Sequence, residues 1–214
     1  MGLKLINGLF YYEHKLDVDN QALIDEIIYT RENPTEDLNK SRPHHLEMDE
    51  QHTFYEDVPL KEDTFDLLNV KINEVTDQVF GIKDAMYCSE IWGHVVNPGE
   101  QTMIHTHHEK DSIGLSWVYY PHMPAKSGNL VFIANADQQR IMWEIQSTPG
   151  TLYLFSRDIL HFTPRNASKE IRVSISGNCA ANPELSSVLN NDVEFKNNYW
   201  YFTGRDGENI INHE

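Results

Sequence analysis

Apolar residues recur three or four positions apart in two segments of the first part of the chain. The segment 19–31 reads DNQALIDEIIYTR, and Asp19 or Asn20 is suited to cap its first turn. The segment 64–80, TFDLLNVKINEVTDQVF, repeats the same amphipathic pattern. Each segment therefore predicts a helix that packs one face on a larger body.

The stretch between these helices is polar and contains two prolines over residues 33–51, so it predicts a loop or flap near the body of the domain. From residue 85 onward the pattern changes to short runs rich in Tyr, Trp, Val, Ile and Phe. Turn signals separate these runs at Asn97-Pro-Gly, Lys126-Ser-Gly-Asn, Asn135-Ala-Asp and Thr148-Pro-Gly. We expect a mainly β fold, a double-stranded β-helix (jelly roll, cupin-like) with supporting N-terminal helices.

Length and composition bound the domain organisation. The 214 residues, 40% hydrophobic and 23% charged, fit a single domain over residues 1–214. Within it we expect helices and loops in residues 1–84, the jelly-roll core in 85–204 and a tail in 205–214. The two cysteines are too few for a disulfide scaffold, and their strand-like surroundings predict buried free thiols.

The charge balance and the hydropathy limit the partners of the chain. Seventeen Lys and Arg stand against 33 Asp and Glu, a formal charge of -16 that repels phosphate backbones and makes a nucleic acid an unlikely partner. No apolar run approaches the roughly 20 residues that span a bilayer. The opening MGLKLINGLFYY also lacks the pattern of a signal peptide. We expect a soluble cytoplasmic protein without a membrane partner.

Three histidines lie close together in GEQTMIHTHHEKD, residues 99–111, and neutral imidazole is the commonest protein ligand for transition metals. If the segment after Gly99 is extended, His105 and His107 share a face. A third ligand must then arrive from a distant strand, and His161 follows the predicted strand 151–159. The pattern indicates a metal site with open positions for substrates, whereas most of the other histidines, His94 among them, are expected to have no chemical role.

A second polar group lies on the segment 171–176, where three aliphatic residues alternate with Arg172, Ser174 and Ser176. One face of this strand is apolar and the other carries a cation and two hydroxyls. A guanidinium with a serine on the same face is suited to bind a carboxylate through charge-assisted hydrogen bonds. The sequence therefore favours a small carboxylate held near the metal.

The second half of the chain resembles the 2-oxoglutarate- and Fe(II)-dependent dioxygenases, in particular an uncharacterised branch common in phage and marine bacterial genomes. The resemblance rests on the order of these parts: Asn97-Pro-Gly-Glu, His105-Thr-His107, Leu115-Ser-Trp-Val-Tyr-Tyr120, Ser127-Gly-Asn-Leu-Val-Phe132, Pro149-Gly-Thr-Leu-Tyr-Leu-Phe155, His161-Phe-Thr-Pro164 and Arg172-Val-Ser-Ile-Ser-Gly-Asn178.

The resemblance implies iron ligands at His105, His107 and His161 and a cosubstrate clamp of Arg172 and Ser174, with Tyr120 as a further clamp residue. It also implies Fe(II), 2-oxoglutarate and O2 as cofactor and cosubstrates, ascorbate as a candidate reductant, and hydroxylation of an unidentified primary substrate. For the branch resembled, it implies the cytosol of a bacterium or of a phage-infected host. A homodimer is left open.

The chain departs from the usual pattern of this family, which has His-x-Asp or His-x-Glu where this sequence has His105-x-His107. Three neutral histidines leave Fe(II) with its full positive charge. Two acidic residues could supply a carboxylate instead: Glu109 together with His107, or Asp111 reaching back to the metal. We favour His105 for its distance from Gly99 and because the branch resembled often carries His-x-His.

Two other functions are compatible with the histidine pattern. One is a cupin-type metalloprotein or metal-dependent enzyme that does not use 2-oxoglutarate, because the spacing from Gly99 to Asp111 imitates a first cupin motif. The other is a non-catalytic jelly-roll module with a vestigial site. The primary substrate is not indicated, although residues 33–51 and the aromatic segment 197–202 could flank the mouth of the site.

Overall fold

The computed structural model describes residues 2–6, 9–33, 56–58, 60–84, 86–107, 114–136 and 139–182. Two antiparallel sheets form its centre, one with the strand order β1-β2-β8-β5-β10-β4-β3 and one with the order β7-β6-β9. The large sheet consists of β1 (Gly2–Ile6), β2 (Leu9–Lys15), β3 (Glu56–Val58), β4 (Met86–Val96), β5 (Gly114–His122), β8 (Thr151–Ser156) and β10 (Arg172–Ala181). The small sheet consists of β6 (Leu130–Ala136), β7 (Gln139–Ile145) and β9 (Leu160–Phe162).

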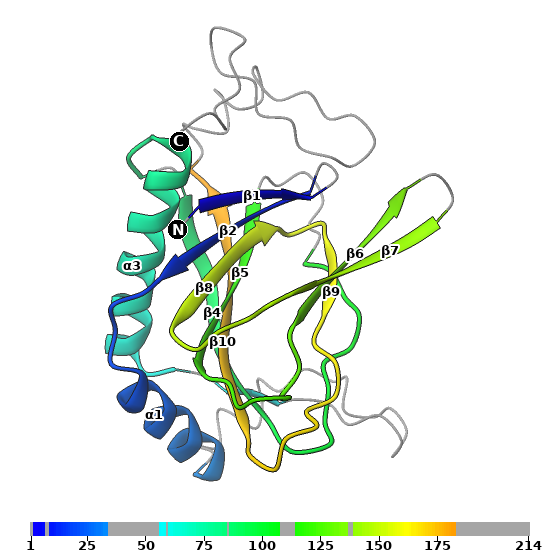
Figure 1. Cartoon of the computed structure of the whole chain (residues 1–214). Coiled ribbons are helices and arrows are strands. Elements are labelled where there is room, and N and C mark those ends of the chain that lie inside the picture. The colour runs from blue at the N-terminus through cyan, green and yellow to red at the C-terminus, as the bar shows by residue number, and fades with distance from the viewer. Residues whose placement is uncertain are drawn as a thin grey trace, which may run out of the picture.

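Two helices, α1 (Asn20–Glu32) and α3 (Glu62–Phe80), lie along one face of the large sheet, and the small sheet lies on its other side (Figure 1). Each face has its own core. Leu68 and Ile72 of α3 pack with Trp117 and Ile175 on the helix side. On the other side, residues of both sheets form the second cluster: Tyr11, Val118, Tyr120, Leu130, Phe132, Ile145, Tyr153, Phe155 and Ile159. The mainly β jelly roll with supporting helices is confirmed.

Both predicted helices form, within two residues of the expected bounds. The Asp19 carboxylate caps α1 by accepting a hydrogen bond of 3.1 Å from the backbone N–H of Ala22. Helix α3 starts two residues before the predicted Thr64 and ends at Gly81, whose φ of 65° is the left-handed conformation that closes many helices. Local periodicity and capping chemistry were therefore sufficient to predict these elements.

The prediction of helices and loops alone in residues 1–84 was wrong, because β1, β2 and β3 belong to the large sheet. β2 pairs with the distant β8, where Tyr12 is opposite Leu154, and β3 pairs with β4. The sequence LFYYEHK of β2 has no clean alternation of polar and apolar residues, so its strand character depends on partners far along the chain. A periodicity argument has no access to such partners.

Three predicted segments lie outside the described residues: most of the flap 33–51, the aromatic segment 197–202 and the tail 205–214. Cys88 and Cys179 are buried free thiols, as expected, and lie opposite each other on β4 and β10. Neither α1 nor α3 combines the length and the apolar character that a membrane-crossing helix needs, and this holds for the described part of the chain only.

Candidate metal and carboxylate site

The chain enters the site through a tight turn at residues 97–100, directly after β4. Gly99 has a φ of 91°, which a residue with a side chain rarely adopts, and its N–H donates to the Asn166 carbonyl at 2.7 Å. The Glu100 carboxylate accepts from both the backbone N–H of Asn97 (2.7 Å) and its side-chain amide (2.9 Å). The Asn-Pro-Gly-Glu motif thus fixes the direction in which the following histidine segment leaves the sheet.

His105 and His161 are brought together by the backbone. The N–H of each donates to the carbonyl of the other, at 3.1 and 3.0 Å, in an isolated antiparallel bridge. Their ring centroids are 4.3 Å apart, and that of His107 lies 4.9 Å from His105 and 5.2 Å from His161. The structure therefore gathers all three histidines predicted from the sequence, and their candidate ligand atoms all lie within 4.8 Å of one another.

Hydrogen bonds to the backbone orient two of the three rings. The Nδ1 of His105 is 2.7 Å from the Met103 carbonyl, and the Nδ1 of His161 is 2.8 Å from the Ile159 carbonyl. A carbonyl only accepts, so Nδ1 carries the hydrogen in both rings and Nε2 keeps its lone pair. This is the arrangement in which an imidazole binds a metal through Nε2 while its other nitrogen is held in place.

All three imidazoles are neutral at pH 7. Burial is the largest cause: it lowers the pKa of His105, lowers that of His107 to about 4 and lowers that of His161 well below the ordinary value of 6.5. The neighbouring histidines lower the pKa of His107 and His161 further. Metals bind the neutral imidazole, so this site does not have to lose protons before it accepts a cation.

Two hydrogen bonds join Arg157, directly after β8, to the backbone of His107. Its Nε donates to the His107 carbonyl at 2.9 Å, and its own carbonyl accepts from the His107 N–H at 2.9 Å. The arginine is buried, and Gly114 leaves room for it, since a Cβ there would lie 2.5 Å from the Arg157 Cδ. Arg157 therefore positions the third imidazole without contacting the space between the rings.

Arg157→Gln is expected to weaken divalent metal binding by about 10-fold or more, a size typical of residues that orient metal ligands. The reason is that the His107 backbone loses the donor to its carbonyl. A titration of metal-free protein with Co(II), followed by visible absorption, measures the change. Arg140→Gln, on an exposed position of β7, is the matched control. Wild-type Co(II) affinity in a folded Arg157→Gln protein would show that this contact does not position His107.

Glu109 and Asp111, the alternative acidic ligands, lie outside the described residues. The choice between His107 and a carboxylate therefore stays a prediction, which the ligand variants considered in the Discussion address.

Arg172 lies at the start of β10 and is only 1% exposed. One of its terminal nitrogens donates to the carbonyls of Ser127 (2.6 Å) and Gly128 (3.4 Å), while its buried Nε has no hydrogen-bond partner among the described residues. No described carboxylate forms a salt bridge with it. Burial lowers its pKa, but an arginine remains charged at pH 7. The fold therefore buries a cation whose charge has no partner in the described chain.

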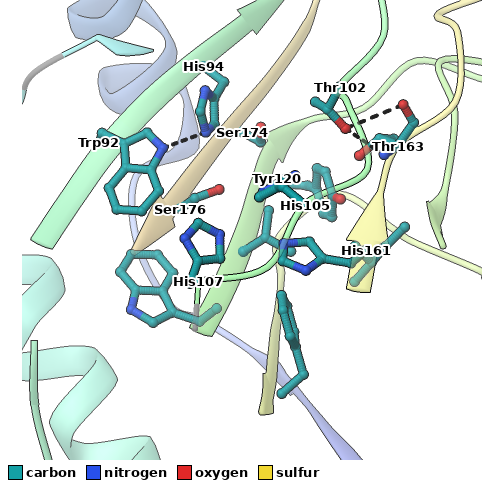
Figure 2. A pocket seen from close by; sticks show the side chains of 14 residues that line it. Trp92, His94, Thr102, His105, His107, Tyr120, His161, Thr163, Ser174 and Ser176 are labelled. Atoms are coloured by element: carbon teal, nitrogen blue, oxygen red, sulfur yellow. Dashed lines mark hydrogen bonds between the residues drawn. The ribbon is translucent and has the colours of Figure 1, made fainter. Parts of the chain in front are cut away.

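The other two predicted clamp residues, Ser174 and Tyr120, line the same cavity as the three histidines, and this cavity opens between the two sheets (Figure 2). Burial raises the pKa of Tyr120, so its hydroxyl keeps its proton. Among the described residues, the lining consists of Trp92, His94, Thr102, His105, His107, Trp117, Val118, Tyr120, Leu130, Phe155, His161, Thr163, Ser174 and Ser176. None of these described residues is acidic, so the described lining does not repel an anionic ligand.

Trp92 and His94 on β4 are among the lining residues that sequence reasoning did not predict. They are opposite Ser176 and Ser174 in the register of β4 and β10. His94 was expected to have no chemical role, because a single histidine in a strand carries no motif. The available signal was the alternation of Trp92 and His94 with Ile91 and Gly93, which places both on one face of the strand.

The chain shares the fold of the 2-oxoglutarate- and Fe(II)-dependent oxygenases, a jelly roll. Over 92% of this chain and 88% of the other, it is similar to the epimerase SnoN in complex with Fe3+, alpha ketoglutarate and nogalamycin RO (TM-score 0.62, 13% identity). It is also similar to the carbocyclase SnoK from nogalamycin biosynthesis, over 80% and 79% (TM-score 0.61, 12% identity). A prolyl-4-hydroxylase from Pseudomonas putida matches over 80% and 92% (TM-score 0.52, 15% identity). No family model and no curated protein matches the sequence.

Proposed function

We propose that this protein is an Fe(II)-dependent oxygenase that couples the oxidative decarboxylation of 2-oxoglutarate to the hydroxylation of an unidentified primary substrate. The observation that carries the proposal is the buried Arg172, a cation without a carboxylate partner among the described residues, two positions before Ser174 on the strand that lines the histidine cavity.

The three histidines suit a catalytic metal. Their candidate ligand nitrogens lie within 4.8 Å of one another, and all three rings line the cavity, which leaves room for exogenous ligands. His105, His107 and His161 would hold Fe(II), and the bound ion would supply the O2 activation and the redox chemistry that the side chains lack. The chain itself contributes orientation, through the carbonyls of Met103 and Ile159.

The clamp residues suit the far carboxylate of 2-oxoglutarate. A guanidinium donates two parallel hydrogen bonds to a carboxylate, and a buried pair of this kind is stronger than one in water. The Ser174 and Tyr120 hydroxyls lie on the cavity wall as further donors. An anion of this size would also relieve the cost of burying Arg172 unpaired, which amounts to several kcal/mol for an isolated ion.

The same observation favours this function over a cupin-type metalloprotein without 2-oxoglutarate. A site that binds only a metal gains nothing from a buried cation on the strand facing it, because the cation repels the metal. A carboxylate cosubstrate between the two charges turns both interactions into attractions. The fold shared with SnoN, solved with Fe3+ and alpha ketoglutarate, is compatible with this arrangement.

The proposal is tested with purified protein loaded anaerobically with Fe(II). We expect 2-oxoglutarate to bind stoichiometrically by calorimetry only when metal is present, and succinate to form slowly on admission of O2 with ascorbate, even without the primary substrate. Protein that binds Fe(II) tightly but never binds 2-oxoglutarate would favour the cupin-type alternative. Protein that binds neither would favour a non-catalytic module.

A further inference from the structure

Trp92 and His94 form one wall of the cavity, on β4 next to β10. In the register of the two strands, His94 is opposite Ser174 and Trp92 is opposite Ser176. Figure 2 shows both rings beside these serines, and it shows His107 near Trp92. The ring centroids of Trp92 and His107 are 5.8 Å apart. The pair therefore adjoins the carboxylate clamp at one end and the metal ligands at the other.

A hydrogen bond fixes the His94 ring. The Trp92 indole Nε1–H donates to the His94 Nε2 at 2.6 Å, and the two rings meet edge to face at 89°. Indole nitrogen only donates, so His94 must be neutral at Nε2 and carry its hydrogen on Nδ1. This defines both the tautomer and the orientation of a ring that is 5% exposed.

His94 lies within electrostatic reach of both anchors of the site. Burial lowers its pKa well below the ordinary value, and Arg172, His105 and His107 lower it further. His94 lines the same cavity as the three histidines and is opposite Ser174, so a molecule that reaches from the metal ligands to the Ser174 end of the cavity lies beside the His94 ring. Because the orientation of the His94 ring is fixed, the ring limits the space that is available to such a molecule.

We propose that His94, held in place by Trp92, determines which 2-oxo dicarboxylic acid the site accepts, by fitting the length of 2-oxoglutarate between the metal ligands and Arg172. This inference rests on the proposed function. His94 would contact the cosubstrate, and Trp92 is a positioning residue that acts through His94.

Chain-length selectivity is the property that separates this role from packing. One methylene more or less in a fitted pocket changes binding by about 10- to 200-fold. A residue that only packs would, when shortened, weaken the binding of all acids alike through loss of stability. If a residue limits the length of the ligand, shortening its side chain should weaken the binding of 2-oxoglutarate and allow a longer acid to bind better.

The experiment compares 2-oxoglutarate with 2-oxoadipate, which is one methylene longer, by anaerobic calorimetry on Co(II)-loaded protein. We expect wild type to prefer 2-oxoglutarate and His94→Ala to reduce the ratio of the two affinities by about 10-fold or more. His94→Gln, whose amide oxygen can replace Nε2 as acceptor for Trp92, should keep most of the preference. Trp92→Phe removes the donor but keeps an aromatic ring, and should reduce the ratio even if His94→Ala does not fold.

An unchanged ratio in folded His94→Ala or Trp92→Phe protein, with or without an equal loss for both acids, would overturn the inference while leaving the proposed function intact. Wild-type protein that binds Co(II) but neither acid would instead remove the proposed function and this inference with it.

Discussion

Replacing Arg172 with methionine is expected to weaken 2-oxoglutarate binding severely and, at the same time, to stabilise the metal-free protein. Truncating one partner of a buried charge pair costs about 2–5 kcal/mol of binding, which corresponds to a loss of roughly 30-fold or more. Metal binding should remain, because Arg172 contacts none of the three histidines. Calorimetry of the Co(II)-loaded variant measures the loss of 2-oxoglutarate binding.

The gain in stability follows from the desolvation of Arg172. This cation, which has no carboxylate partner among the described residues, is 1% exposed, and an isolated buried ion costs several kcal/mol. The carbonyls of Ser127 and Gly128 lose their donor in the variant, at about 1–3 kcal/mol for an unsatisfied buried group, so the net gain is small. At this chain length each net kcal/mol raises the melting temperature by about 2–4 °C. Differential scanning calorimetry of metal-free wild type and metal-free Arg172→Met measures the change in melting temperature.

Arg140→Met is the matched control, since Arg140 is exposed on β7 and should change neither quantity. Undiminished 2-oxoglutarate binding by Arg172→Met would contradict the clamp assignment. A clearly lower melting temperature would mean that Arg172 stabilises the fold and is not a charge reserved for a ligand.

The elements that could be predicted from the sequence are those whose cause is local. Helix α1 follows from apolar spacing and the Asp19 cap, and the turn at Gly99 follows from its motif. Strand β2 was missed because its partner β8 lies far along the chain, and β1 was missed with it because β1 pairs with β2. A strand at the edge of a sheet is stabilised by its neighbour more than by its own sequence.

The residues of the site also differ in whether a local pattern predicts them. His105 and His107 could be paired by alternation alone, and the placement of His161 followed from the family resemblance and its position after a strand. Alternation places Trp92 and His94 on one face of β4, but their place in the site depends on the register that sets them opposite Ser176 and Ser174. Register is a property of two strands together, and neither sequence contains it alone.

Replacing His161 with alanine is expected to weaken divalent metal binding by more than about 100-fold, because even residues that only orient metal ligands contribute 10- to 100-fold. The bridge between His161 and His105 uses backbone atoms, so it should survive the substitution and keep the site otherwise in place. Co(II) titration by visible absorption measures the affinity. His122→Ala, at the end of β5 and outside the cavity lining, is the control.

The same titration on each ligand variant defines the coordinating set. If three imidazoles bind the metal, His105→Ala and His107→Ala should lose as much affinity as His161→Ala, while Glu109→Gln and Asp111→Asn stay near wild type. If a carboxylate takes the place of one imidazole, that histidine variant keeps its affinity and the corresponding acidic variant loses it. The second pattern would restore the negative charge that the usual family motif provides, and would leave His161 as the ligand common to both arrangements.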